Sequence, residues 1–170
     1  FEQSSKEFDR ARVIFRFALD NIPKSHAKKL YDEFTTFEKQ FGNRDSIMNV
    51  LTSRCRFQYE ETLLRDPLDY DTWFDYIRLE ESKVLEQQDS SIDLTRELYE
   101  RAIANFPPTN TKEDWKRYIY IWIKYAFFEE VKAKNIKKAR QIYRTCLDYI
   151  PHNEFSFSKI WIMFTRFELR

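Results

Sequence analysis

The sequence predicts an all-α fold, a right-handed superhelical solenoid of antiparallel helix pairs, from two repeated residue patterns and from composition. In the first pattern an aromatic residue stands seven positions before a glutamate, in the pairs Tyr31–Glu38, Trp73–Glu80, Trp122–Glu129 and Trp161–Glu168. In the second an arginine stands eleven positions before a proline, at Arg12, Arg56, Arg96 and Arg140. Patterns that recur at about forty residues are typical of helical solenoids. A single glycine in 170 residues leaves little material for sheet turns.

The two patterns define two kinds of helix, A and B. In helix A, apolar residues three and six positions after the leading aromatic share one face with the glutamate. In helix B, an aromatic and an aliphatic residue follow the arginine at three and seven positions, and the proline ends the helix. We expect helices over residues 6–21, 25–41, 46–65, 71–88, 91–105, 112–134, 136–149 and 156–170. The expected N-caps are Asp71, Ser91, Thr111 and Ser156.

These helices divide the chain into repeats. The order is a helix B over residues 1–24, repeats over 25–68, 69–109 and 110–152, and a helix A over 153–170. Solenoids usually finish with polar capping repeats, so we expect this chain to be one segment of a longer solenoid.

Composition argues against several function classes. The chain has 29 basic and 28 acidic residues, without the basic excess of most phosphate-tracking domains. Two cysteines and two histidines lack the spacing of a zinc site or a disulfide framework, so we expect no metal, no cofactor and a reducing compartment. No apolar run is long enough to cross a bilayer, and the sequence predicts a soluble chain that binds no membrane.

The sequence also predicts no enzyme. Adjacent carboxylates, such as Glu60 and Glu61, point about 100° apart on a helix and cannot share a catalytic site. Cys146 lies in a predicted helix and His152 lies beyond its terminal proline, so core packing explains the cysteine better than nucleophilic catalysis.

Two motifs resemble the HAT (half-a-TPR) repeat of RNA-processing proteins: Trp-x-x-Tyr-x-x-Leu-Glu at residues 73–80 and Arg-x-x-Tyr-Glu-Arg-Ala-Ile at 96–103. Longer segments, including 11–15, 37–42, 56–61, 99–108 and 115–123, resemble the crooked-neck family of HAT-repeat spliceosome components. The resemblance covers essentially the whole chain. It implies a nuclear scaffold of pre-mRNA splicing that contacts other spliceosomal proteins within the NineTeen-associated complex. The alternatives are a HAT scaffold of mRNA 3′-end or ribosomal-RNA processing, and a TPR-like adaptor outside RNA metabolism.

The repeated charges suggest structural ion pairs. We expect each glutamate of helix A to approach the arginine of the following helix B, in the pairs Glu38–Arg56, Glu80–Arg96 and Glu129–Arg140. A bidentate guanidinium–carboxylate contact would fix the register between helices. The alternative is a set of solvent-exposed pairs that add little stability.

Three surfaces are candidates for binding. Tyr120 and Phe127 lie on a second stripe of their helix, which is either buried against neighbouring helices or part of a groove for a partner helix. A lysine cluster is a candidate RNA contact, although lysines at a turn more often serve to solubilise it; its members are Lys132, Lys134, Lys137 and Lys138. The last helix is apolar almost all round, which predicts self-association of the fragment.

Overall fold

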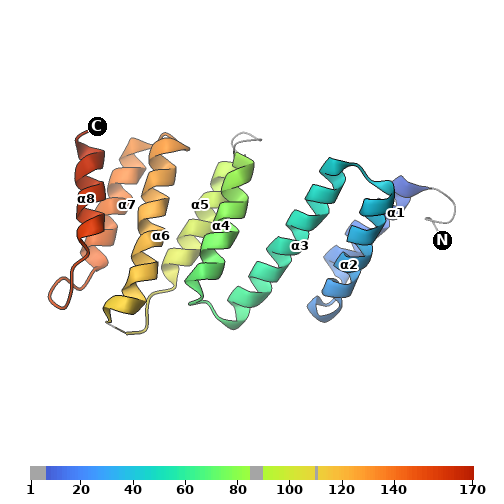
Figure 1. Cartoon of the computed structure of the whole chain (residues 1–170), viewed down its shortest axis with the longest axis horizontal. Coiled ribbons are helices and arrows are strands. Elements are labelled where there is room, and N and C mark those ends of the chain that lie inside the picture. Colours follow the sequence, from blue (N-terminus) through green and yellow to red (C-terminus); the bar gives the residue numbers. More distant parts are fainter. Residues whose placement is uncertain (1–6, 85–89, 110) are drawn as a thin grey trace. The chain divides into compact units, whose positions relative to one another are not determined.

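The computed structural model describes residues 7–84, 90–109 and 111–170. These residues contain eight α-helices and no strand (Figure 1). The helices are α1 (Phe8–Asn21), α2 (Lys24–Phe41), α3 (Arg44–Arg65), α4 (Tyr70–Val84), α5 (Ser90–Ala104), α6 (Lys112–Val131), α7 (Ile136–Tyr149) and α8 (Ser158–Glu168). Each corresponds to one predicted helix, so the all-α class is confirmed. The right-handed sense of the superhelix and the repeat boundaries stay predictions.

The largest difference from the predicted boundaries is at the end of α6, which stops at Val131 rather than at residue 134. Lys134 adopts a left-handed backbone conformation with φ 53°, which no helix can include. Residues 85–89, the predicted end of α4, lie outside the described residues.

Most of the predicted N-caps are wrong. Asp69 rather than Asp71 accepts the backbone N–H of Thr72, at 3.1 Å. Thr111 stands at the N-cap of α6, but its hydroxyl donates to the Asp114 carboxylate and makes no capping bond. The predicted position is therefore two residues too late at α4 and right at α6, where the Thr111 side chain bonds another side chain instead of the backbone.

The same outcome holds at two further helix starts. Phe157 rather than Ser156 precedes α8, and Ser91 lies inside α5, which begins at Ser90. Asn135, which the sequence analysis did not select, caps α7 by accepting the backbone N–H of Lys138 at 3.1 Å.

The chain divides into two compact units, Phe1–Glu60 and Glu61–Arg170, with the division inside α3. In the described part of the first unit, α1 packs on α2 through a cluster that contains Phe34, Phe37 and Val50. Phe15 stacks on Phe34 with ring centroids 4.8 Å apart. The core of this unit is therefore largely aromatic.

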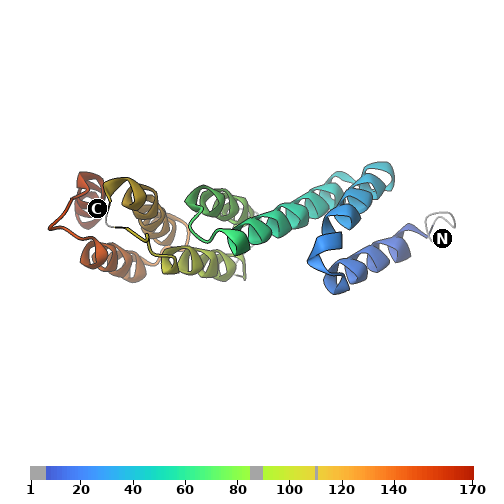
Figure 2. The ribbon, with the colours of Figure 1, turned by 90° about the horizontal axis from the view of Figure 1, so that it is seen from below.

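The second unit has its helices in two layers. Helices α4, α6 and α8 form one layer, and α5 and α7 form the other (Figure 2). Helix α6 contacts α4, α5, α7 and α8, which explains why Trp115, Tyr118 and Tyr125 are almost completely buried. A middle helix of a repeat array must bury more than one face. The layer of A-type helices is the one that carries the candidate site.

Candidate protein-docking groove

The repeated arginines pair with glutamates, but with a different partner from the one predicted. Three arginines bond the glutamate of the next helix A: Arg12 with Glu38, Arg96 with Glu129 and Arg140 with Glu168. In the second unit, Arg96 Nε donates to Glu129 Oε1 at 2.6 Å and Arg96 Nη2 donates to Oε2 at 3.0 Å. The predicted pairs Arg96–Glu80 and Arg140–Glu129 are therefore wrong. The prediction for Glu38 is wrong as well, because its carboxylate binds Arg12 and not Arg56.

The reason lies in which face of helix B turns toward which neighbour. The arginine shares a face with the aromatic residue three positions later, Tyr99 in α5. Tyr99 stacks on Tyr125 of α6 with centroids 4.7 Å apart and also contacts Phe128. Since this stripe packs on the following helix A, the guanidinium meets the glutamate of that helix. Sequence spacing alone does not distinguish the two A helices that neighbour α5, which are α4 and α6.

The ion pairs differ in burial: some are largely buried, and one is exposed to solvent. The glutamates Glu38, Glu80 and Glu129 are at most 1% exposed, and Arg56 is half-buried. The Glu168 side chain is 36% exposed and the Arg140 side chain 37%. The hydrogen bond from Arg140 lowers the pKa of Glu168 from its ordinary 4.5, and the bond to Glu129 raises the pKa of Arg96. These pairs hold neighbouring helices together.

The leading aromatics also differ from one another. Trp73 is buried and its indole N–H donates to the Pro67 carbonyl at 2.9 Å. In α6, Trp115 makes the equivalent bond, to Thr109 O at 3.1 Å. Trp122, the predicted repeat position, is buried, but its Nε1 has no hydrogen-bond partner among the described residues. In α4, Trp73 is both the repeat position and the residue that makes this bond. In α6, which has 20 residues against 15 in α4, two residues share these features: Trp122 is the repeat position and Trp115 makes the bond.

The first and last leading aromatics are less buried than the repeat predicts. Tyr31 is half-buried and packs on Phe57, with ring centroids 5.6 Å apart. Trp161 is 47% exposed, and its ring packs against the His152 ring. The described helices pack on the opposite side of α8, through the buried Ile160.

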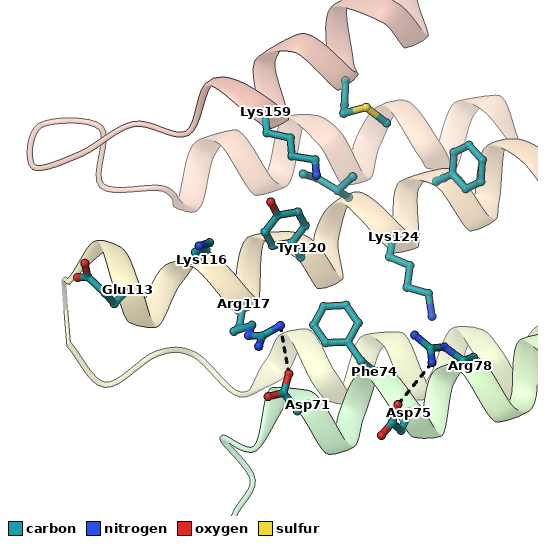
Figure 3. Close-up of a pocket in the computed structure, with 13 residues that line it drawn as sticks. Asp71, Phe74, Asp75, Arg78, Glu113, Lys116, Arg117, Tyr120, Lys124 and Lys159 are labelled. Carbon is teal, nitrogen blue, oxygen red and sulfur yellow. Dashed lines mark ion pairs between the residues drawn. The ribbon is translucent and has the colours of Figure 1, made fainter.

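The second stripe of α6 lines a groove rather than lying wholly in the core. Phe127 is 44% exposed and Tyr120 is half-buried, so neither is enclosed by the neighbouring helices. The groove has a volume of about 1060 Å³ and runs over α6 between α4 and α8 (Figure 3). Its lining comprises Asp71, Phe74, Asp75, Arg78, Glu113, Lys116, Arg117, Tyr120, Ile123, Lys124, Phe127, Lys159 and Met163. Tyr120 and Phe127 therefore line a groove, and the binding of a partner helix there stays a prediction.

The groove has an apolar floor and a charged rim. On one wall the Arg117 guanidinium lies 3.3 Å from the Asp71 carboxylate, and Figure 3 shows this pair across the α4–α6 junction. The Lys159 ammonium, from α8, lies 4.3 Å from the centre of the Tyr120 ring. Lys124 binds Glu81 at 3.1 Å at the far end. Arg117, Lys124 and Lys159 are therefore held in place around the apolar floor.

Sequence reasoning missed the residues that α4 and α8 contribute, namely Phe74, Lys159 and Met163. A signal for them does exist. Relative to each leading tryptophan, the groove positions are −2, +1, +2 and +5, and they recur in order from helix to helix. Position −2 is Asp71, Tyr120 and Lys159; +1 is Phe74 and Ile123; +2 is Asp75, Lys124 and Met163; +5 is Arg78 and Phe127. The groove is thus a property of the repeat rather than of α6 alone.

The predicted RNA cluster is only partly available. Lys138 is half-buried, and its ammonium lies 3.1 Å from Glu100 and 5.7 Å from the centre of the Tyr125 ring. Lys134 and Lys137 are exposed, and Lys132 is half-exposed. Three of the four lysines can therefore meet a ligand without breaking an ion pair that the structure shows.

Cys146 and His152 do not form a nucleophile–base pair in the structure. Burial raises the pKa of the Cys146 thiol, which disfavours the thiolate that a nucleophile requires. The His152 ring bonds the Leu147 carbonyl at 2.9 Å instead of the thiol. Within the residues the structure describes, no three His, Cys, Asp or Glu side chains gather as metal ligands. None of the described helices is long and apolar enough to pass through a bilayer.

Comparison with known proteins places this geometry in a family. Residues 55–170 match the family described as pre-mRNA-splicing factor Syf1/CNRKL1 N-terminal HAT repeat. Over all 170 residues the chain is 46% identical to Protein crooked neck of Drosophila melanogaster and 49% identical to pre-mRNA-splicing factor clf1 of Aspergillus fumigatus, covering 23% and 24% of those proteins. It is 52% identical over 151 residues, 89% of the chain, to Crooked neck-like protein 1 of Dictyostelium discoideum, of which it covers 21%.

The chain thus spans less than a quarter of the length of these relatives. The paired helices, the Arg–Glu contacts between them and the match over residues 55–170 agree with one another. The chain belongs to the Syf1/CNRKL1 N-terminal HAT-repeat family of pre-mRNA-splicing factors.

Proposed function

We propose that the chain is a non-enzymatic scaffold in nuclear pre-mRNA splicing, where it helps to assemble or stabilise the spliceosome within the NineTeen-associated complex. The groove over α6 carries this proposal, because an apolar floor with a polar rim is the composition of a protein-docking surface. The relative from Aspergillus fumigatus is named a pre-mRNA-splicing factor, which supports the biological setting.

Replacement of one floor residue tests the proposal. Phe127→Ser removes an aromatic side chain from the groove, whereas Val131→Ser changes an apolar residue of the same helix that is equally exposed, at 44%, but does not line the groove. The protein that carries this chain is tagged and purified from nuclear extract, and spliceosomal proteins are quantified by mass spectrometry. We expect Phe127→Ser to lose spliceosomal proteins and Val131→Ser to retain them.

The same experiment separates the alternatives. Recovery of cleavage and polyadenylation factors or ribosomal-RNA processing factors would point to another HAT scaffold, and recovery of chaperones would point to an adaptor outside RNA metabolism. Equal recovery of spliceosomal proteins by both variants would remove the groove from the proposal.

Direct RNA contact at the turn between α6 and α7 is a second proposal, supported by the exposure of Lys134 and Lys137. Each phosphate contact adds close to one unit to the slope of log affinity against log salt. Replacement of the exposed lysines by alanine is expected to lower this slope for single-stranded RNA. An unchanged slope would exclude this turn as an RNA site.

Self-association of the fragment through α8 is a further proposal. Trp161 is 47% and Ile162 50% exposed, which leaves apolar surface on this helix open to water. Light scattering at high concentration is expected to show dimers or larger species. A Trp161→Ser variant that scatters like the parent would locate the contact elsewhere.

A further inference from the structure

We propose that the groove over α6 binds an amphipathic α-helix of another protein whose apolar face is bordered by acidic side chains. This inference rests on the proposed scaffold function and adds the chemistry of the partner. It is drawn from the shape, the spacing and the charges of the groove.

The shape of the groove favours a helix over an extended strand. In the described part of the chain the groove is built by helices only, so no sheet edge offers backbone partners to a strand. A helix satisfies its own backbone hydrogen bonds and needs only side-chain contacts. Helices α4 and α8 both pack against α6. At 8–10 Å for each neighbour their axes stand about 16–20 Å apart with α6 between them, so a partner helix would lie on the open face of α6 and contact side chains of α4 and α8 from above.

The spacing of the floor residues matches the anchor spacing of a helix. Tyr120 and Phe127 are seven residues apart on α6, a distance of about 10 Å along its axis. Ile123 lies between them, and Phe74 and Met163 border them from the two sides. Apolar anchors at i, i+3 or i+4, and i+7 of a partner helix span the same two turns.

The charges select an acidic border. Five cationic and three acidic side chains line the groove. Three of the cations are already paired, Arg117 with Asp71, Arg78 with Asp75 and Lys124 with Glu81, which leaves Lys116 and Lys159 against Glu113. Among the described residues, no hydrogen bond or ion pair involves the exposed Lys116 ammonium. A carboxylate beside the apolar anchors would be attracted to this rim, and a lysine in the same place would be repelled.

A single-stranded RNA fits the same surface less well. Its bases could stack on Tyr120 or Phe127, but a run of bases needs a continuous row of flat rings along the groove. Ile123, which lies between Tyr120 and Phe127 on α6, and Met163 beside them offer no flat stacking surface. A protein helix uses the whole lining, so we argue for it alone.

Designed peptides test the proposal directly. Three labelled helical peptides of about 18 residues, or five turns, share one leucine face and differ only in the bordering residues, which are glutamate, glutamine or lysine. Their binding to the whole 170-residue chain is measured by fluorescence anisotropy, with oligouridylate as the RNA probe. We expect the glutamate peptide to bind most tightly, and Phe127→Ser to weaken it by roughly 30-fold or more while Val131→Ser does not.

A charge reversal distinguishes specific recognition from general attraction. The Lys116→Glu/Lys159→Glu variant is expected to bind the lysine peptide better than the glutamate peptide, by about tenfold. Lys132→Glu/Lys137→Glu carries the same change in net charge outside the groove lining and should keep the preference for glutamate. A gain of binding to the lysine peptide cannot result from misfolding.

Several results would overturn the proposal. Equal affinity for the three peptides, an identical response to the two double reversals, or oligouridylate binding that Phe127→Ser abolishes would each exclude the acidic helix. If Phe127→Ser releases spliceosomal proteins while peptide charge has no influence, the scaffold function stands and only the partner chemistry fails.

Discussion

The buried pair of Arg96 and Glu129 allows a sharp test of how the helices are held together. Replacement of Arg96 by methionine keeps most of the packing volume but leaves the Glu129 carboxylate, which is 0% exposed, without its bidentate donor. The closest remaining cation is the Lys138 ammonium, 4.0 Å away. Breaking a buried pair by removing one member costs about 3–5 kcal/mol, because the other charge remains desolvated.

The magnitude can be read from urea denaturation followed by tryptophan fluorescence. All four tryptophans lie in the second unit, so the signal reports the unit that contains the altered pair. With an m value near 2 kcal/mol/M, Arg96→Met should lower the midpoint by about 1.5–2.5 M urea. Far-UV circular dichroism follows the whole chain in parallel and shows whether the transitions coincide.

Two further variants make the reasoning refutable. Arg96→Met/Glu129→Leu removes both charges and should recover most of the lost stability, since an apolar pair of similar volume carries no desolvation cost. Arg140→Met breaks the equivalent pair where both side chains are more than a third exposed, and should barely move the midpoint. If Arg96→Met shifts the midpoint no more than Arg140→Met does, or if the double variant is no better than the single one, burial does not decide the cost.

Three other predictions concern single positions. Gly42→Ala should destabilise the first unit by about 1–3 kcal/mol. The reason is that a β-carbon there would overlap the Glu38 carboxylate and lie 2.6 Å from the Glu38 carbonyl oxygen. Unchanged amide hydrogen exchange in α2 would contradict this. Asn135→Ala should cost about 1 kcal/mol in urea denaturation through loss of the α7 cap, whereas Asn135→Ser should retain most of it. The stability that Glu168 gains from Arg140 should be present above its ordinary pKa of 4.5 and be lost as pH falls through the lower pKa of the folded state, because the folded chain favours the ionised form. An NMR titration in which Arg140→Gln leaves the Glu168 pKa unchanged would rule out that linkage.

Local features of the chain could be predicted well because they depend on residues close in sequence. Helix A and helix B follow from apolar positions three and four residues apart and from a terminal proline, and each predicted helix exists. Proline ends helix B wherever it stands, so these boundaries were the more accurate ones. The end of α6 was missed because a lysine, Lys134, takes the left-handed conformation in which glycine is usual.

The repeat also predicted half of the groove. The exposed stripe through Tyr120 and Phe127 is visible in the sequence of one helix, but whether neighbouring helices cover it depends on their packing. Lys159 and Met163 reach the groove from a helix almost forty residues later, and only the positions that recur relative to the tryptophans connect them. The α4 and α8 walls follow from positions outside the core that recur relative to each leading tryptophan, and not from the aromatic stripe of α6 alone.

The sequence by itself determined the helices, their order, their apolar faces and the family, because helix periodicity and repeat spacing are properties of the chain. Tertiary structure decided which of two neighbouring A helices each arginine meets, since both bring a glutamate to the same end of helix B. It also decided that Trp115 makes the anchoring bond that Trp73 makes, and that Trp161 stays half-exposed. The physical reason is that a side chain's direction on its helix is local, whereas the partner it finds and the water it loses depend on every helix packed around it.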